Sequence, residues 1–180
     1  MDIIEEWCFP RVGNRIRNRT VLAALTNKQS NDDGTLSDEE INFLLRRGQG
    51  GFGIVTSAAS HVMENGQGWP GEMGVWGDHH ITGLTKLAEG LREQGAMSLV
   101  QIFHGGMRAP ADLIGTTPIS ASFNDEKNGN EPAREMSEDE IQNAIEAFAA
   151  AAERCEKAGI DGVEIHGAHG YLIAQFLGTL

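Results

Sequence analysis

The chain has 180 residues, 40% of them hydrophobic, and carries 26 acidic against 14 basic side chains, a formal net charge of −12. This acidic excess argues against a nucleic acid or an anionic membrane as a partner, because both require a surplus of Lys and Arg. An acidic N-terminus, only two cysteines and the lack of a long apolar run predict a cytoplasmic protein without a signal peptide, membrane span or disulfide framework.

The first part of the chain alternates short apolar segments with helical patterns. After an expected N-terminal hairpin, residues 20–25 (TVLAAL) predict a strand that is buried on both faces. Ser37 and Glu40 predict a capping box at the start of an amphipathic helix, and residues 53–56 (GIVT) predict the second strand. The glycine-rich stretch 57–79 is expected to be a mobile loop, although its two tryptophans favour packing.

The same alternation continues in the second part. Apolar residues between 81 and 91 fall on one helical face, and residues 96–103 (AMSLVQIF) predict the third strand. A second mobile loop is expected at 104–136, with its tip in the polar tract 125–131. Ser137 and Glu140 then repeat the capping box.

The helix that begins at Ser137 is predicted to run to Ala158, and residues 162–166 predict the fourth strand. An apolar stripe along this helix predicts its buried face, with the second cysteine as part of the core. The stripe consists of Ile141, Ile145, Phe148, Ala152 and Cys155.

The order strand, helix, strand, helix, strand, helix, strand predicts parallel strands with right-handed crossovers. Long loops follow the strands and tight glycine turns follow the helices, which is typical of a (βα) barrel with its active site at the carboxyl ends of the strands. Four strands make about half of a TIM (β/α)8 barrel, in one domain over residues 1–180. A doubly wound nucleotide-binding sheet is disfavoured, because neither GxGxxG nor GxxxxGK[ST] is present.

The stretch 162–176 places two histidines and the only tyrosine of the chain close together after the fourth strand. His166, His169 and Tyr171 are open to three interpretations. One is a metal site, for which Glu164 would have to act as the third ligand. Another is ordinary loop packing, and the last is a hydrogen-bonding clamp for a carbonyl or phenolate oxygen with a tyrosine as proton donor. The clamp requires a separate hydride source.

The other three strand ends offer small residues, hydroxyls and an amide. Leu25 and Thr26 follow the first strand, Ala58 follows the second, and Gln101 lies near the end of the third. Such residues suit a planar heterocycle that forms hydrogen bonds at its edge.

Four segments together resemble the old yellow enzyme family of FMN-dependent NAD(P)H:flavin oxidoreductases. They are NRTVLAALT (18–26), GGFGIVTSAA (50–59), SLVQIFHGGMR (98–108) and GVEIHGAHGYLIAQFL (162–177). The resemblance covers essentially the whole chain and implies the N-terminal half of an FMN-binding TIM barrel.

The resemblance also implies roles for individual residues. The histidines His166 and His169 would hold the electron-withdrawing oxygen of the substrate, and Tyr171 would protonate its carbon. The flavin would lie against the residues Ala23, Ala24, Leu25, Thr26, Ala58 and Gln101, and no metal site is implied. The implied reaction is the reduction of FMN by NADH or NADPH, followed by hydride transfer to an activated alkene such as an α,β-unsaturated carbonyl.

Family members continue through four more strand-helix units, which carry the main FMN phosphate site. The chain alone is therefore expected to bind FMN weakly and to associate, either as a homo-oligomer or with a complementing half-barrel. Two other functions stay open at this point. One is a non-catalytic half-barrel that acts as an assembly or binding module, and the other is a metal-dependent lyase or hydrolase.

Overall fold

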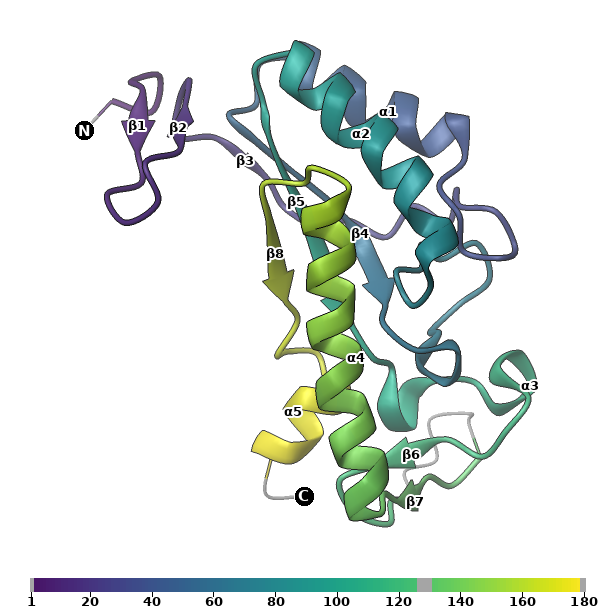
Figure 1. The fold of residues 1–180 in the computed structure, drawn as a ribbon. Helices are drawn as coiled ribbons and strands as arrows, with labels where there is room; N and C mark the ends of the chain where they lie inside the picture. Colours follow the sequence, from purple (N-terminus) through teal and green to yellow (C-terminus); the bar gives the residue numbers. More distant parts are fainter. Residues whose placement is uncertain (1, 126–130, 179–180) are drawn as a thin grey trace.

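The structure is a computed structural model that describes residues 2–125 and 131–178. Its centre is a parallel sheet of four strands in the order β3-β4-β5-β8. The strands are β3 (Val21–Leu22), β4 (Ile54–His61), β5 (Met97–Phe103) and β8 (Gly162–Ile165). The helices α1 (Asp38–Gln49), α2 (Ile81–Glu93) and α4 (Glu138–Lys157) connect them and lie along one face of the sheet (Figure 1). The predicted alternation of strands and helices is confirmed.

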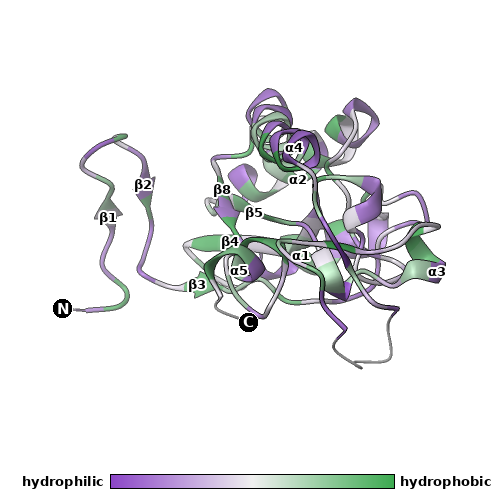
Figure 2. Ribbon diagram, turned by 90° about the horizontal axis from the view of Figure 1, so that it is seen from below, coloured by the Kyte–Doolittle hydropathy of each residue, from purple (hydrophilic) through white to green (hydrophobic). Residues whose placement is uncertain are grey.

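Smaller elements surround this sheet. The N-terminal hairpin, β1 (Trp7–Cys8) paired antiparallel with β2 (Arg15–Ile16), projects away from the rest of the chain (Figures 1 and 2). The other short elements gather toward the carboxyl ends of the strands (Figure 1). They are η1 (Glu64–Gly66), η2 (Asp78–His80), η3 (Gly106–Arg108), α3 (Ala111–Ile114), β6 (Ile119–Ser120), β7 (Arg134–Glu135) and α5 (Leu172–Leu177).

Tight turns return the chain from the helices to the strands, as predicted. Gly95 after α2 has φ of 69° and Gly159 after α4 has φ of 80°, a left-handed conformation that glycine adopts without steric cost. Strand β5 begins two residues after Gly95 and β8 begins three residues after Gly159. Both turns therefore lie at the amino ends of the strands and leave the opposite edge to the long loops.

The two predicted capping boxes differ in the structure. At α4, Ser137 and Glu140 satisfy each other's backbone N–H groups, so that box is complete. At α1, the Ser37 hydroxyl accepts from the Glu40 N–H, but the Glu40 carboxylate is fully buried and accepts from Asn27 and Ser30. The box predicted at Ser37 is therefore only half formed, because the loop after β3 uses the Glu40 carboxylate instead.

The main hydrophobic core lies between the sheet and the helices α2 and α4. Cys155 is 1% exposed within it, so its predicted place in the core is confirmed. The stretch 57–79 contributes Val62, Met73 and Val75 to the same cluster, which shows that much of this segment is packed. The tip of the second predicted loop lies largely outside the described residues.

Several predicted strand properties are wrong. The first strand covers only Val21–Leu22, and Val21 is 50% exposed because β3 lies at the edge of the sheet. The second strand extends to His61, five residues beyond its predicted end. The fourth strand ends at Ile165, whose side chain is 62% exposed on the other edge of the sheet. Burial on both faces is thus wrong for the first strand, because an edge strand has no neighbour on one side.

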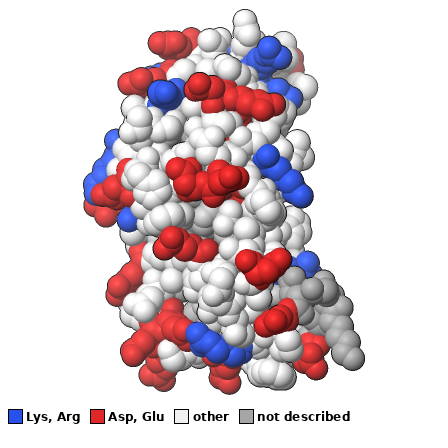
Figure 3. All heavy atoms as spheres, turned by 90° about the vertical axis from the view of Figure 1, so that its right-hand side faces the viewer, with Lys and Arg blue, Asp and Glu red and all other residues white. Residues whose placement is uncertain are grey.

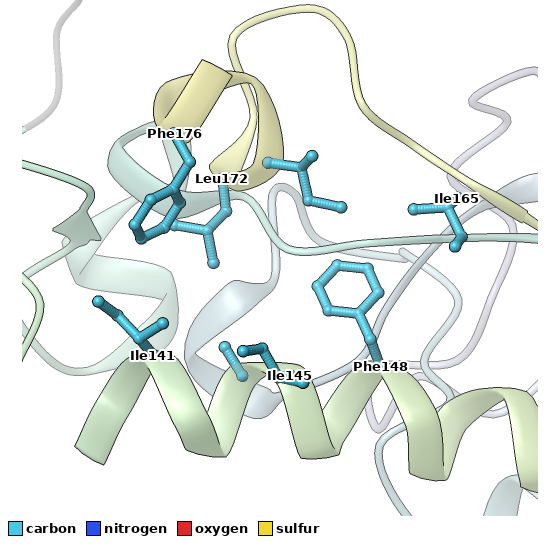
Figure 4. Close-up of a pocket in the computed structure, with 8 residues that line it drawn as sticks. Ile141, Ile145, Phe148, Ile165, Leu172 and Phe176 are labelled. Atoms are coloured by element: carbon cyan, nitrogen blue, oxygen red, sulfur yellow. The ribbon is translucent and has the colours of Figure 1, made fainter. Parts of the chain in front are cut away.

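An apolar groove of about 400 Å³ opens beside β8 (Figure 4). It explains why Ile145, which was predicted to be buried, is 58% exposed: its side chain lines the groove and not the core. The groove is lined by side chains of α4, β8 and α5, namely Ile141, Ala144, Ile145, Phe148, Ile165, Leu172, Ile173 and Phe176.

The surface reflects the composition. Asp and Glu side chains are spread over the face shown in Figure 3, and Lys and Arg side chains lie singly between them. The hydropathy colouring marks β3 and β4 as hydrophobic and α4 as mixed, and the mixed colouring is expected for an amphipathic helix (Figure 2). Within residues 2–125 and 131–178, no helix is both long and apolar enough to cross a membrane.

Candidate functional site

The residues His166, His169 and Tyr171 lie together at the carboxyl edge of the sheet, directly after β8. The Nε2 atom of His166 is 3.2 Å from the Nδ1 atom of His169. The Tyr171 ring meets the His166 ring edge-on, with the ring centroids 5.0 Å apart, and it packs against Phe103 at 4.9 Å. The sequence cluster is therefore also a cluster in space.

A tight turn brings these side chains together. His169 has φ of 58°, which is unusual for a residue with a side chain, and Gly170 continues the turn with φ of 69°. The Tyr171 N–H then donates to the Ala168 carbonyl at 3.2 Å, and Tyr171 becomes the N-cap of α5. Such backbone strain is retained where the surrounding structure fixes it, and it is often found at functional sites.

The hydrogen bonds assign a tautomer to His166. Its Nδ1 atom accepts from the Ala168 N–H at 3.2 Å, so the proton lies on Nε2 and is donated to His169. The pKa of His166 is lowered by burial and, to a smaller extent, by the neighbouring His169. A neutral imidazole N–H is therefore present at neutral pH, and it can donate to an oxygen that replaces His169.

Tyr171 is half-buried in this cluster. Burial raises the pKa of its phenol, the Glu72 carboxyl raises it further, and Arg108 opposes them. The hydroxyl thus keeps its proton at neutral pH, as a proton donor requires.

The six residues predicted to contact a flavin lie just after β3 or on β4 and β5. The parallel register pairs Leu22 with Val55 and Ala59 with Gln101, so the segment 23–26 and Ala58 point toward the same edge of the sheet. Leu25 is 59% exposed and Ala58 is buried. The predicted flavin site is thus exposed to solvent at the segment after β3 and buried at β4.

A β-bulge shapes the β4 side. The pairing of β4 with β5 shifts between Thr56 and Ala59, which places Ser57 and Ala58 opposite the single residue Val100. The Ser57 hydroxyl accepts from the Gln101 N–H at 3.2 Å and donates to the Ala58 carbonyl at 2.7 Å. The bulge therefore fixes the backbone of Ala58 relative to Gln101.

The Gln101 amide itself reaches the neighbouring strand. Its Nε2 atom donates to the Glu164 carboxylate at 2.6 Å, across the register pair that joins β5 and β8. A half-buried carboxamide and small residues nearby fit the hydrogen-bonding edge and the flat face of an isoalloxazine ring. Binding of such a ring would require the amide to exchange Glu164 for the ligand.

The sequence reasoning missed a buried pair behind the site. His61 Nδ1 and Glu72 Oε1 are 2.8 Å apart, and the two side chains are 3% and 0% exposed. The distance would suit an ion pair, but burial raises the pKa of Glu72 to about 9 and lowers that of His61 to about 3. The contact is therefore a hydrogen bond between two neutral groups. The two residues lie 11 positions apart in a glycine-rich segment, and no periodic pattern links them.

This pair predicts a pH-dependent stability. The unfolded chain releases the Glu72 proton near its ordinary pKa of 4.5, whereas the folded chain keeps it up to about pH 9, so stability falls between these values. His61 opposes this only below its ordinary pKa of 6.5, where the unfolded chain gains a proton. Between pH 6.5 and 9 we expect a loss of up to about 1.4 kcal/mol per pH unit.

Denaturant unfolding of the wild type and of Glu72→Gln over this range measures the effect. The glutamine keeps the shape and the contacts with His61 and Gly68 but does not titrate, so its free energy of unfolding should depend less on pH. Two parallel stability curves would contradict the assignment of a protonated Glu72.

No group of three or more His, Cys, Asp or Glu side chains that could hold a metal ion occurs within the described ranges 2–125 and 131–178. The three residues His166, His169 and Glu164 do not form such a group. The geometry gives the metal-dependent interpretation no support.

Comparison with known proteins identifies the family. The sequence model of the NADH:flavin oxidoreductase / NADH oxidase family matches residues 11–180. The chain belongs to this family. It is 40% identical over 174 residues to the probable NADH-dependent flavin oxidoreductase YqiG of Bacillus subtilis (strain 168), covering 97% of this chain and 46% of that protein.

Two further relatives show where this chain lies within the family. The NADH:acrylate oxidoreductase of Vibrio harveyi is 38% identical over 97% of this chain and 17% of its own length. The structure of an old yellow enzyme homologue from Zymomonas mobilis superposes with a TM-score of 0.90 at 26% identity, over 99% of this chain and 52% of that one. The chain thus spans about half the length of the Bacillus and Zymomonas proteins.

These findings confirm the fold, which is the N-terminal half of an old yellow enzyme TIM barrel. They also confirm the cofactors for the family, FMN with NADH or NADPH as reductant, since relatives include NADPH dehydrogenases. The chain is accordingly a member of an oxidoreductase family.

Proposed function

We propose that this flavin oxidoreductase takes hydride from NADH or NADPH and reduces activated alkenes, such as α,β-unsaturated carbonyl compounds. The observation that carries the proposal is the convergence of two imidazoles and a protonated phenol at the edge of the sheet that also bears Gln101. The similarity to an NADH:acrylate oxidoreductase supports it, because acrylate is an alkene conjugated to a carboxylate.

Different residues of this chain would bind the substrate oxygen and donate the proton. The imidazoles of His166 and His169 bind the substrate oxygen and stabilise the negative charge that develops on it. His169 is exposed, so its ring can turn from His166 toward the ligand. Tyr171 donates its phenolic proton to the substrate carbon, and Phe103 holds its ring in place.

FMN would lie against Ala23, Ala24, Leu25 and Thr26, with Ala58 beside the ring and Gln101 at its hydrogen-bonding edge. When bound, it supplies the hydride that none of these side chains can provide. The exposure of Leu25 at the end of β3 is compatible with such a ligand, and so is the Gln101 amide, which would exchange Glu164 for it.

The apolar groove beside β8 suggests how the site is completed. Its lining is almost entirely hydrophobic, and β8 lies at the edge of the sheet with no strand on its outer side, a combination that favours burial against another sheet-and-helix layer. We propose that a complementing half-barrel, equivalent to the second half of the Bacillus relative, covers this groove (Figure 4). Pairing of two copies of this chain is the alternative.

One experiment tests both proposals. The chain is mixed with FMN in the presence and absence of the C-terminal half of the Bacillus relative, and molar mass and visible flavin absorbance are measured after desalting. We expect a 1:1 complex that retains FMN and reduces 2-cyclohexenone with NADH. A flavin-free complex would support a non-catalytic half-barrel, and a dimer of this chain alone would show that a second copy covers the groove.

A further inference from the structure

One side-chain amide, that of Gln175 on α5, joins two loops at the carboxyl edge of the sheet. Its Nε2 atom donates to the Gly170 carbonyl at 2.7 Å and to the Gly105 carbonyl at 3.4 Å, and its Oε1 atom accepts from the Met107 N–H at 3.2 Å. Gly170 immediately precedes Tyr171, whereas Gly105 and Met107 follow β5. Both polar atoms of the amide are therefore used to hold these loops together.

The surrounding backbone is fitted to this amide. The Leu172 N–H donates to the His104 carbonyl at 3.0 Å, so the two loops are also joined by a main-chain hydrogen bond. Gly106 lies in the loop after β5 and has φ of 59°. A Cβ atom at that position would collide with the Gln175 amide. The amide thus occupies space that only a glycine leaves open.

We propose that Gln175 is a positioning residue that sets Tyr171 relative to the end of β5, where Gln101 lies. This rests on the proposed function, in which hydride arrives at the flavin side and the proton arrives from Tyr171. Both transfers must reach the same substrate, and a displacement of about 1 Å can cost about 100-fold in rate. A single amide that fixes the two loops therefore controls how well the two transfers are aligned.

Tyr171 gives a direct measurement of this role, because it is the only tyrosine of the chain. With ¹³C-labelled tyrosine, one ring signal reports its environment and its pKa, with or without flavin. In Gln175→Leu we expect this pKa to fall toward the ordinary value of 10, because a loosened turn exposes the ring. The matched control is Gln142→Leu, which removes a glutamine from the exposed surface of α4 and should change nothing.

Kinetics then separate positioning from a general loss of structure. In the FMN-loaded assembly, Gln175→Leu should lower kcat for alkene reduction by about 10- to 100-fold and leave flavin reduction by NADH unchanged. When combined with Tyr171→Phe, it should cause no further loss, because both substitutions act on the same proton transfer. Additive losses in the double variant would overturn the proposal.

Two milder variants cover the case in which Gln175→Leu does not fold. Gln175→Glu keeps the size of the side chain and its hydrogen-bond acceptor but has no donor when ionised. Gly106→Ala adds a Cβ atom that clashes with the Gln175 amide. An unchanged Tyr171 signal in both would overturn the proposal. If the wild type binds FMN but reduces no alkene, the proposed function fails, and the tyrosine signal still tests Gln175.

Discussion

Replacing His166 with alanine is expected to lower alkene reduction by about 100- to 1000-fold, the loss seen when one donor to a developing oxyanion is removed. His166 is 8% exposed and its Nε2–H points to the exposed His169, so the donor is fixed in place before a ligand arrives. Such a preorganised donor costs little to align during the reaction. The effect should therefore appear in kcat as well as in ligand affinity.

A phenol such as 4-hydroxybenzaldehyde, which places an oxyanion in the clamp, provides the binding measurement. Loss of one hydrogen bond to a charged oxygen should weaken its binding to the FMN-loaded assembly by about 10-fold or more. His79→Ala is the matched control, because His79 is an exposed histidine that packs against Trp76 and not within this cluster. Equal phenol affinity in the His166 variant and the wild type would contradict a role of His166 in binding the substrate oxygen.

Tyr171→Phe is expected to have an effect of similar size through a different step. General acid catalysis typically contributes about 100- to 10,000-fold, and the substitution removes only the hydroxyl. The phenylalanine ring can keep the contacts with Phe103 and His166, so binding of the phenol should not change. The loss should therefore be confined to protonation of the substrate carbon.

The choice of acceptor makes this test specific. Reduction of a quinone needs no proton on carbon, so the variant should reduce a quinone at the wild-type rate while alkene reduction is lost. Stopped-flow reduction of the flavin by NADH should be unchanged as well. A parallel loss with both acceptors would indicate that the hydroxyl supports the structure of the site and not the proton transfer.

Some parts of the fold follow from local sequence patterns. Gly95 and Gly159 form the tight glycine turns predicted after the helices, and Ser137 forms the complete capping box, because a turn or cap depends on a few neighbouring residues. The grouping of His166 with Tyr171 was predictable for the same reason, since two glycines within five residues leave few ways to continue a strand.

Other features depend on contacts that are distant in the sequence. An apolar stretch predicts a buried strand, but the exposure of Val21 and Ile165 is set by their position at the sheet edges. The Glu40 side chain leaves its expected cap because Asn27 and Ser30 offer it a buried partner. Gln175 was visible as part of a motif, one helical turn after Tyr171, but its contacts with Gly105 and Met107 arise only when β5 and β8 pair.

The separation between tight glycine turns at one edge of the sheet and long loops at the other has a consequence for amino-acid substitutions. Changes in the loops alter which molecule is admitted and leave the turns that fold the chain intact, whereas changes at Gly95 or Gly159 affect folding before they affect chemistry. The choice of substrate and the folding of the chain therefore depend on different residues. The clamp and the proton donor lie on the side of the long loops, but they are anchored by β8 and α5, so their positions depend on the scaffold that folds the chain.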